Sequence, residues 1–140
     1  MREIKIRAKS VENNQWIDDG WGIFESIPRL GRRAHYIYTD HGYYEVHKES
    51  IGQSTYLKDK TVTDDMPEGI EIFENDILFD PITNEKYVVK WDEYYACYFL
   101  KNTIDELNKQ DYDFAEYDHE VGNGLYVIGN KFENPELINS

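Results

Sequence analysis

The chain has 140 residues, of which 40% are hydrophobic and 15% aromatic, and its formal net charge is -13. This length fits one domain or two small subdomains, and the many aromatic residues exclude a disordered acidic chain. Residues 1–63 hold 10 basic and 9 acidic side chains, whereas residues 64–140 hold 5 and 19, so the second half carries the negative excess. Such a charge disfavours non-specific binding to nucleic-acid phosphates.

A single cysteine, Cys97, excludes an intramolecular disulfide and any zinc site built from several cysteines. The N-terminal stretch MREIKIRAKS has no apolar run of the kind that signal peptides carry. The longest apolar run, at 94–100, is far shorter than the roughly 20 residues that a spanning helix needs. We therefore expect a cytoplasmic protein with no membrane span.

The first half predicts a β-meander. Ile4, Ile6 and Ala8 alternate with charged residues, which is the pattern of a strand with one buried face. Turn residues follow at 12–14, and a hairpin is expected from strands near 34–39 and 43–48 around the Asp-His-Gly loop. Between these elements the stretch QWIDDGWGIF continues the meander, and PRLGRR predicts a loop.

The second half predicts further strands after a loop at 56–69, which has neither helical nor strand periodicity. We expect two strands around a turn in IEIFENDILFD, two more strands in KYVVKWDEYYACYFL, and a last strand in LYVIGNKF. A capping box at Thr103 and Glu106 predicts one short helix at about 104–110. The expected core residues share the buried phase of these patterns: Ile4, Ile6, Trp16, Ile37, Ile72, Ile77, Phe79, Val89, Trp91, Phe99, Leu107, Val127 and Phe132.

Four blocks in this order, MREIKIRA, SIGQSTYLKDK with IEIFENDILFD, VVKWDEYYACYFL and LYVIGNKFENPELI, resemble the YopX family of phage and prophage proteins over nearly the whole chain. Two positions depart from the family pattern, because Tyr56 and Asn75 stand where a glycine is usual. Asn tolerates a positive φ, whereas Tyr56 indicates either an ordinary φ or local strain. The resemblance implies a mostly β phage product in a bacterial cytoplasm, and it brings no established activity.

The resulting expectation is an all-β single domain over residues 1–140. It has a β-meander N-terminal half and an SH3-like small-barrel C-terminal half with one short helix. Its β-rich subdomains span 1–55 and 70–140, with a connector at 56–69.

The sequence contains no motif that predicts an enzyme. The four histidines lack metal-site spacing, and phosphate-binding and nucleophile motifs are absent from the sequence. With 28 acidic residues, carboxylate pairs occur by chance and do not define an acid–base site. We expect no catalytic residue, no metal and no cofactor.

Two groups of residues are candidates for binding, each with a solvated surface as the alternative. Arg29, Arg32 and Arg33 form a basic loop that suits an anion. The acidic, aromatic segment 105–120 suits a basic partner. Its candidate contact residues are Asp111, Tyr112, Asp113, Glu116, Tyr117 and Asp118.

The function that these features favour is an accessory or regulatory protein of a phage or prophage, which acts by binding a basic host or phage protein. The alternative is a small-barrel nucleic-acid-binding module. Tyr36, Tyr38, Tyr43 and Tyr44 would be its aromatic platforms. Self-association is left open.

Overall fold

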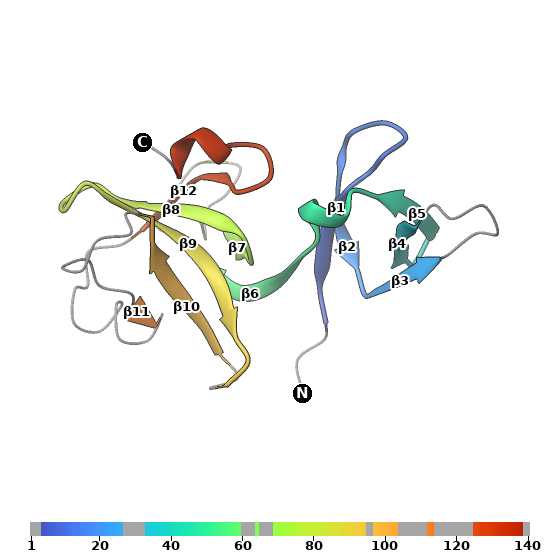
Figure 1. Ribbon diagram of the computed structural model, residues 1–140, viewed down its shortest axis with the longest axis horizontal. Helices are drawn as coiled ribbons and strands as arrows, with labels where there is room; N and C mark the ends of the chain where they lie inside the picture. The colour runs from blue at the N-terminus through green and yellow to red at the C-terminus, as the bar shows by residue number, and fades with distance from the viewer. Residues whose placement is uncertain are drawn as a thin grey trace. The chain divides into compact units, whose positions relative to one another are not determined.

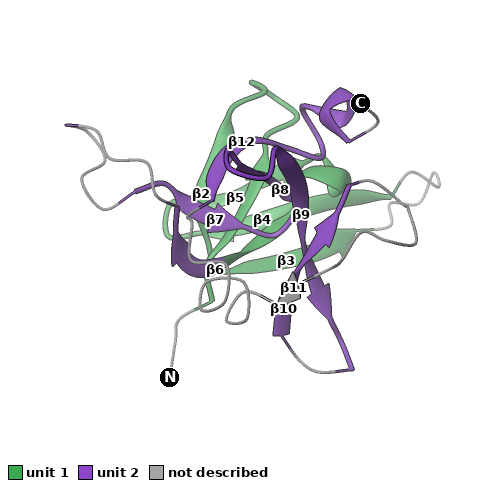
Figure 2. Cartoon of the chain, turned by 90° about the vertical axis from the view of Figure 1, so that its left-hand side faces the viewer, with its two compact units in different colours: residues 1–54 green, residues 55–140 purple. Residues whose placement is uncertain are grey.

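The computed structural model describes residues 4–26, 33–59, 64, 69–94, 97–103, 112–113 and 125–138 (Figure 1). These residues form antiparallel strands with two short 3-10 helices, which confirms the all-β prediction. The chain divides into two compact units, unit 1 at residues 1–54 and unit 2 at residues 55–140 (Figure 2). Among the described residues, no helix has the length and apolar character needed to cross a membrane.

Unit 1 is built from short strands whose alternation follows the sequence pattern. Its elements are β1 (Ile6–Lys9), β2 (Trp16–Gly20), β3 (Gly22–Ser26), β4 (Ala34–Thr39), β5 (Gly42–Val46), η1 (Lys48–Ser50) and the start of β6 (Gly52–Lys58). β1 lies between β2 and β6, and β3, β4 and β5 form the expected meander. Ala8, Ile37 and Val46 form the buried core, against which four half-buried isoleucines pack.

Unit 2 is organised around one five-stranded antiparallel sheet of order β11-β10-β9-β8-β12, and β7 lies beside β6. Its remaining elements are β7 (Glu71–Phe73), β8 (Asp76–Asp80), β9 (Glu85–Asp92), β10 (Cys97–Asn102), β11 (Tyr112–Asp113), β12 (Tyr126–Asn130) and η2 (Pro135–Leu137). The core residues are Ile72, Leu78, Tyr87, Val89, Leu100 and Leu125. Closure into an SH3-like barrel stays a prediction, and the helix expected at 104–110 lies outside the described residues.

Asp59, which closes the block SIGQSTYLKDK, has a buried carboxylate that joins three segments of unit 2. Its Oδ1 accepts a hydrogen bond from the Ile70 backbone N–H at 2.8 Å, and its Oδ2 accepts one from Val127 at 3.0 Å. The Asp59 backbone N–H donates to the Ile70 carbonyl at 2.8 Å. The carboxylate therefore fixes the end of β6 to the residue preceding β7 and to β12.

The turn between β7 and β8 depends on two neighbouring side chains. Asn75 adopts a φ of 74°, which asparagine tolerates better than most residues, as the sequence predicts. Asp76 is buried, and its Oδ2 accepts a hydrogen bond from the Phe73 backbone N–H at 2.8 Å. Asp76 thus satisfies a backbone donor that would otherwise be buried without a partner.

The C-terminal block IGNKFENPEL forms a closed turn after β12. The Asn134 side-chain oxygen accepts from the Asn130 backbone N–H at 3.2 Å, and Asn130 Oδ1 accepts from Glu133 at 2.8 Å. A Cβ at Gly129 would overlap the Asn134 side chain, so this position requires glycine. The motif that carries the family resemblance most specifically therefore shapes the fold.

Two parts of the sequence interpretation are wrong. The loop expected from Tyr56 begins later, because β6 continues to Lys58. Ile4 and Trp91 are exposed at 56% and 43%. Ile4 precedes the first strand, and Trp91 lies on the core face of β9 but near the strand end, where cover from the rest of unit 2 is incomplete.

Candidate functional site

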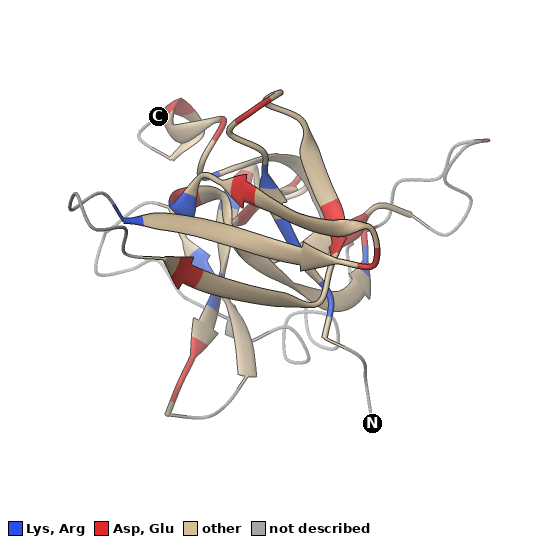
Figure 3. Cartoon of the chain, turned by 90° about the vertical axis from the view of Figure 1, so that its right-hand side faces the viewer, with Lys and Arg blue, Asp and Glu red and all other residues tan. Residues whose placement is uncertain are grey.

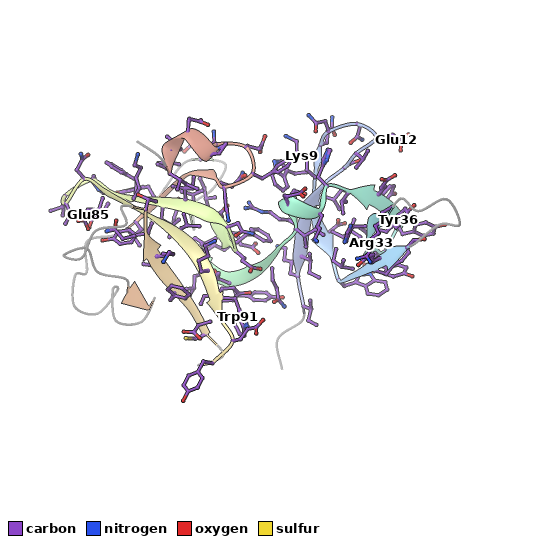
Figure 4. The ribbon with its side chains drawn as sticks, viewed as in Figure 1. Lys9, Glu12, Arg33, Tyr36, Glu85 and Trp91 are labelled. Carbon is purple, nitrogen blue, oxygen red and sulfur yellow. The ribbon has the colours of Figure 1, made fainter. Side chains whose placement is uncertain are left out.

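Five rings of unit 1 form one group, which we name the aromatic cluster. Its members are Trp21, Phe24, Tyr36, Tyr38 and Tyr43. Strand register brings four of them to the same face of the β3–β4–β5 sheet, because Phe24 pairs with Tyr36 and Tyr38 pairs with Tyr43. Trp21, at the bend between β2 and β3, stacks on Tyr38. Figure 4 shows Tyr36 on this sheet.

The rings of the aromatic cluster contact one another in stacked, tilted and edge-to-face geometries. Trp21 stacks on Tyr38 with centroids 5.2 Å apart, and Phe24 stacks on Tyr36 at 4.9 Å, each pair with planes 13° apart. Tyr43 meets Phe24, Tyr36 and Tyr38 edge to face at 5.8 to 6.2 Å. Such pairs stabilise one another, so the cluster is an ordered surface.

The aromatic cluster lies on the face of its sheet that points away from the unit 1 core. Ile37, between Tyr36 and Tyr38, belongs to the core on the opposite face. Trp21 and Tyr43 are 51% and 61% exposed, although large aromatic side chains usually bury most of their surface. The other three rings of the cluster are half-buried, so its exposed part consists of Trp21 and Tyr43. Exposed rings beside other aromatic side chains are typical of a contact surface.

Three of the four tyrosines predicted as aromatic platforms, Tyr36, Tyr38 and Tyr43, lie together on one face of the sheet. Tyr44 pairs with Ile37 and therefore lies on the opposite face from Tyr43. Trp21 and Phe24 were not predicted as members. The alternation of Gly22, Phe24 and Ser26 along β3 was the available signal for Phe24, but the pairing of β3 with β4 had to be known as well.

Of the basic loop the structure describes only Arg33, so the predicted anion site stays a prediction. Arg33 forms an ion pair with Glu25 at 3.4 Å, and His35 Nε2 lies 3.7 Å from the other oxygen of the same carboxylate. Both members of the Arg33–Glu25 pair are well exposed, so the pair contributes little to stability. Arg29 and Arg32 lie outside the described residues.

The predicted partner segment is described only at β11, where the Tyr112 and Asp113 backbones pair with Leu100 and Phe99. The other candidates lie outside the described residues: Asp111, Glu116, Tyr117 and Asp118. This surface therefore stays a prediction.

A polar cleft of about 400 Å³ lies in unit 1, between the β1–β2 turn and the β4–β5 hairpin. Its walls include the acidic side chains of Glu12, Asp18 and Asp19, together with His41 and Tyr44. Among the described residues, no group of three histidine, cysteine or acidic side chains is arranged to hold a metal ion. The cleft is open and carries no arrangement that assigns it a ligand.

The paired strands, their turns and the two cores define an all-β protein made of two antiparallel units. A family model described as YopX protein matches residues 5–139, and the chain therefore belongs to the YopX family. No curated protein matches the chain significantly. The family resemblance is confirmed.

Proposed function

We propose that this protein is a non-enzymatic phage or prophage accessory protein that acts by binding another protein through the aromatic cluster. The observation that carries the proposal is a set of five mutually packed rings with Trp21 and Tyr43 more than half exposed. Aromatic side chains are the commonest energetic anchors of protein interfaces. The cluster is already ordered by its own contacts, so binding costs little side-chain entropy.

The geometry favours a protein partner over a single-stranded nucleic acid. Bases bind by stacking on open ring faces within a basic groove. In the aromatic cluster, Trp21 and Tyr38 cover one face of each other, and Phe24 and Tyr36 do the same. Glu45 pairs in register with Tyr36 and adds an acidic side chain to the same sheet face, which repels phosphates.

Charge supports a basic partner surface. The excess behind the net charge of -13 lies in the second half of the chain, so the charge that bears on the aromatic cluster is local. Glu45 lies on the same sheet face as the rings, and other acidic positions lie at strand ends and turns (Figure 3). Arginine and lysine side chains also interact favourably with tyrosine and tryptophan rings. A partner that presents aliphatic and cationic side chains therefore matches both the rings and the acidic Glu45 beside them.

The test compares two adjacent tyrosines on opposite faces of β5. The tagged full chain is used for affinity recovery from a bacterial host lysate, with Tyr43→Ser as the test variant and Tyr44→Ser as the matched control. We expect Tyr43→Ser to lose a basic protein that wild type and Tyr44→Ser both retain. Neutralising Asp111, Asp113, Glu116 and Asp118 to Asn or Gln tests the acidic segment separately.

Equal recovery by both tyrosine variants contradicts the proposal. Salt-sensitive binding of a single-stranded oligonucleotide that Tyr43→Ser abolishes replaces it with the nucleic-acid alternative. Self-association that depends on Tyr43, measured by sedimentation of the purified protein, assigns the surface to a second copy of this chain.

A further inference from the structure

Basic residues are scarce in the second half of the chain, and three of them come together. Residues 64–140 contain five lysines and no arginine against 19 acidic residues. Lys90 lies on β9, Lys101 on β10 and Lys131 just after β12. We name these three residues the lysine cluster.

Strand pairing brings Lys90 and Lys101 to one face of the sheet. β9 and β10 run side by side (Figure 1), with Lys90 opposite Phe99 and Lys101 opposite Val88. Residues two positions apart along a strand share a face, so the two lysines are diagonal neighbours. Side chains as long as lysine can meet across such a diagonal.

A chain of backbone hydrogen bonds brings Lys131 to the same place. The Lys131 N–H donates to the Asn75 carbonyl at 2.8 Å, and the Asn75 N–H donates to the Val89 carbonyl at 2.9 Å. Lys131 is thereby held near Lys90, the residue after Val89. The backbone link therefore places Lys131 beside the strand position that carries Lys90.

The lysine cluster concentrates positive charge around the half-buried Lys90. Burial lowers the pKa of Lys90 from its usual value, and contact with Lys131 and the charges of Lys131 and Lys101 lower it further. Glu74 opposes this effect, since its charge raises the pKa. Within the described part of the chain, no carboxylate, Glu74 included, forms an ion pair with any of the three lysines.

We propose that the lysine cluster binds a phosphate group, with Lys90, Lys101 and Lys131 each donating to one of its oxygens. Strand register and the backbone link bring the three lysines to neighbouring positions, and amines gathered in this way favour a shared acceptor. A phosphate group offers several strong acceptor oxygens and up to two negative charges, which matches three amines that converge from separate segments. The site belongs to unit 2 and is independent of the aromatic cluster, which belongs to unit 1.

The phosphate group can come from a small phosphorylated compound or from a nucleic-acid strand, and two probes separate these sources. The isotope-labelled full chain is titrated with inorganic phosphate at constant ionic strength, and separately with a short single-stranded oligothymidylate. Amide shifts in the nuclear magnetic resonance spectrum report the affinity. We expect phosphate to shift the amides of β9, β10 and the turn after β12.

Lys131→Gln and Lys90→Gln are the test variants, and Lys48→Gln in unit 1 is the control with the same charge change. Lys131 is exposed, so its replacement leaves the fold intact. Loss of one charge-assisted hydrogen bond should weaken phosphate binding about tenfold in each test variant, with no such loss in Lys48→Gln.

Tighter binding of the oligonucleotide than of phosphate, lost in the same variants, assigns the site to a strand. Equal or weaker binding assigns it to a small phosphate compound. Absence of binding to both probes overturns the proposal, and so does an affinity that both test variants retain.

Discussion

Single side chains with a structural task account for the most specific parts of this sequence. Asp59 accepts backbone hydrogen bonds from Ile70 and from Val127, the latter 68 positions later in the chain. Asn134 caps the turn after β12 in the same manner. Polar residues in the family motifs therefore act on the backbone of unit 2, and their presence does not indicate a catalytic site.

Asp59→Ala removes the acceptor of two partly buried backbone N–H groups. Each unsatisfied donor costs about 1–3 kcal/mol, and partial solvent access reduces that cost, so we expect the free energy of unfolding to fall by about 2–4 kcal/mol. Urea unfolding measures this change. Asp40→Ala, at an exposed turn, is the control and should change the stability by less than about 0.5 kcal/mol. A similar small change for both variants would contradict the assigned role of Asp59.

Tyr56 adopts a φ of 63°, so the strained alternative left open by the sequence is the correct one. A left-handed conformation costs a non-glycine residue about 1–2 kcal/mol. Glycine at this position should therefore give a protein about 1 kcal/mol more stable than alanine does.

The adjacent Leu57 in the same strand has no positive φ and provides the control. There the order should reverse, because glycine in a strand is less stable than alanine by about 0.5–1 kcal/mol. Thermal unfolding of the four variants gives both differences. If alanine is the more stable residue at both positions, Tyr56 is not strained.

At the scale of elements, local alternation was sufficient to predict most strands. The hairpin at 34–39 and 43–48 matches β4 and β5 closely, because turn residues separate two clearly alternating runs. Alternation also places Ile37 in the core. Alternation does not show where other elements stop covering a sheet. It therefore predicted the correct face of β9 for Trp91 but wrongly predicted that its side chain is buried.

Trp91 should contribute less to stability than a buried core tryptophan. Its ring meets Tyr98 edge to face, with centroids 4.8 Å apart and planes 68° apart, while 43% of the residue remains exposed. A fully buried tryptophan would lose about 3–5 kcal/mol on replacement by alanine. For Trp91→Ala we expect about 1–2 kcal/mol, from the ring pair and the partial burial. A loss above about 3 kcal/mol in urea unfolding would restore the buried assignment.

The candidate sites were harder to predict than the strands, because they depend on contacts between distant segments. The aromatic cluster needs the register of β3 against β4 and of β4 against β5. The lysine cluster needs the link from Lys131 through Asn75 to β9. Local periodicity reveals neither the strand register nor the backbone link. The basic loop and the acidic segment, in contrast, can be recognised from composition alone.

At the scale of the whole molecule, residues that hold the fold and residues that are available for contact are separate sets. Asp59, Asp76 and Asn134 direct their polar atoms to backbone groups of unit 2. In unit 1, Trp21 and Tyr43 extend from an ordered aromatic cluster toward solvent. This division is what the proposed binding role of the aromatic cluster requires.

Hydroxyl-radical footprinting of the wild-type chain, free and in the complex recovered from lysate, tests this division most directly. The account predicts that the partner protects Trp21 and Tyr43 from oxidation, while Tyr44 on the opposite face and Tyr126 of unit 2 react equally in both samples. Unchanged oxidation of Trp21 and Tyr43 in a complex that protects other residues would contradict it.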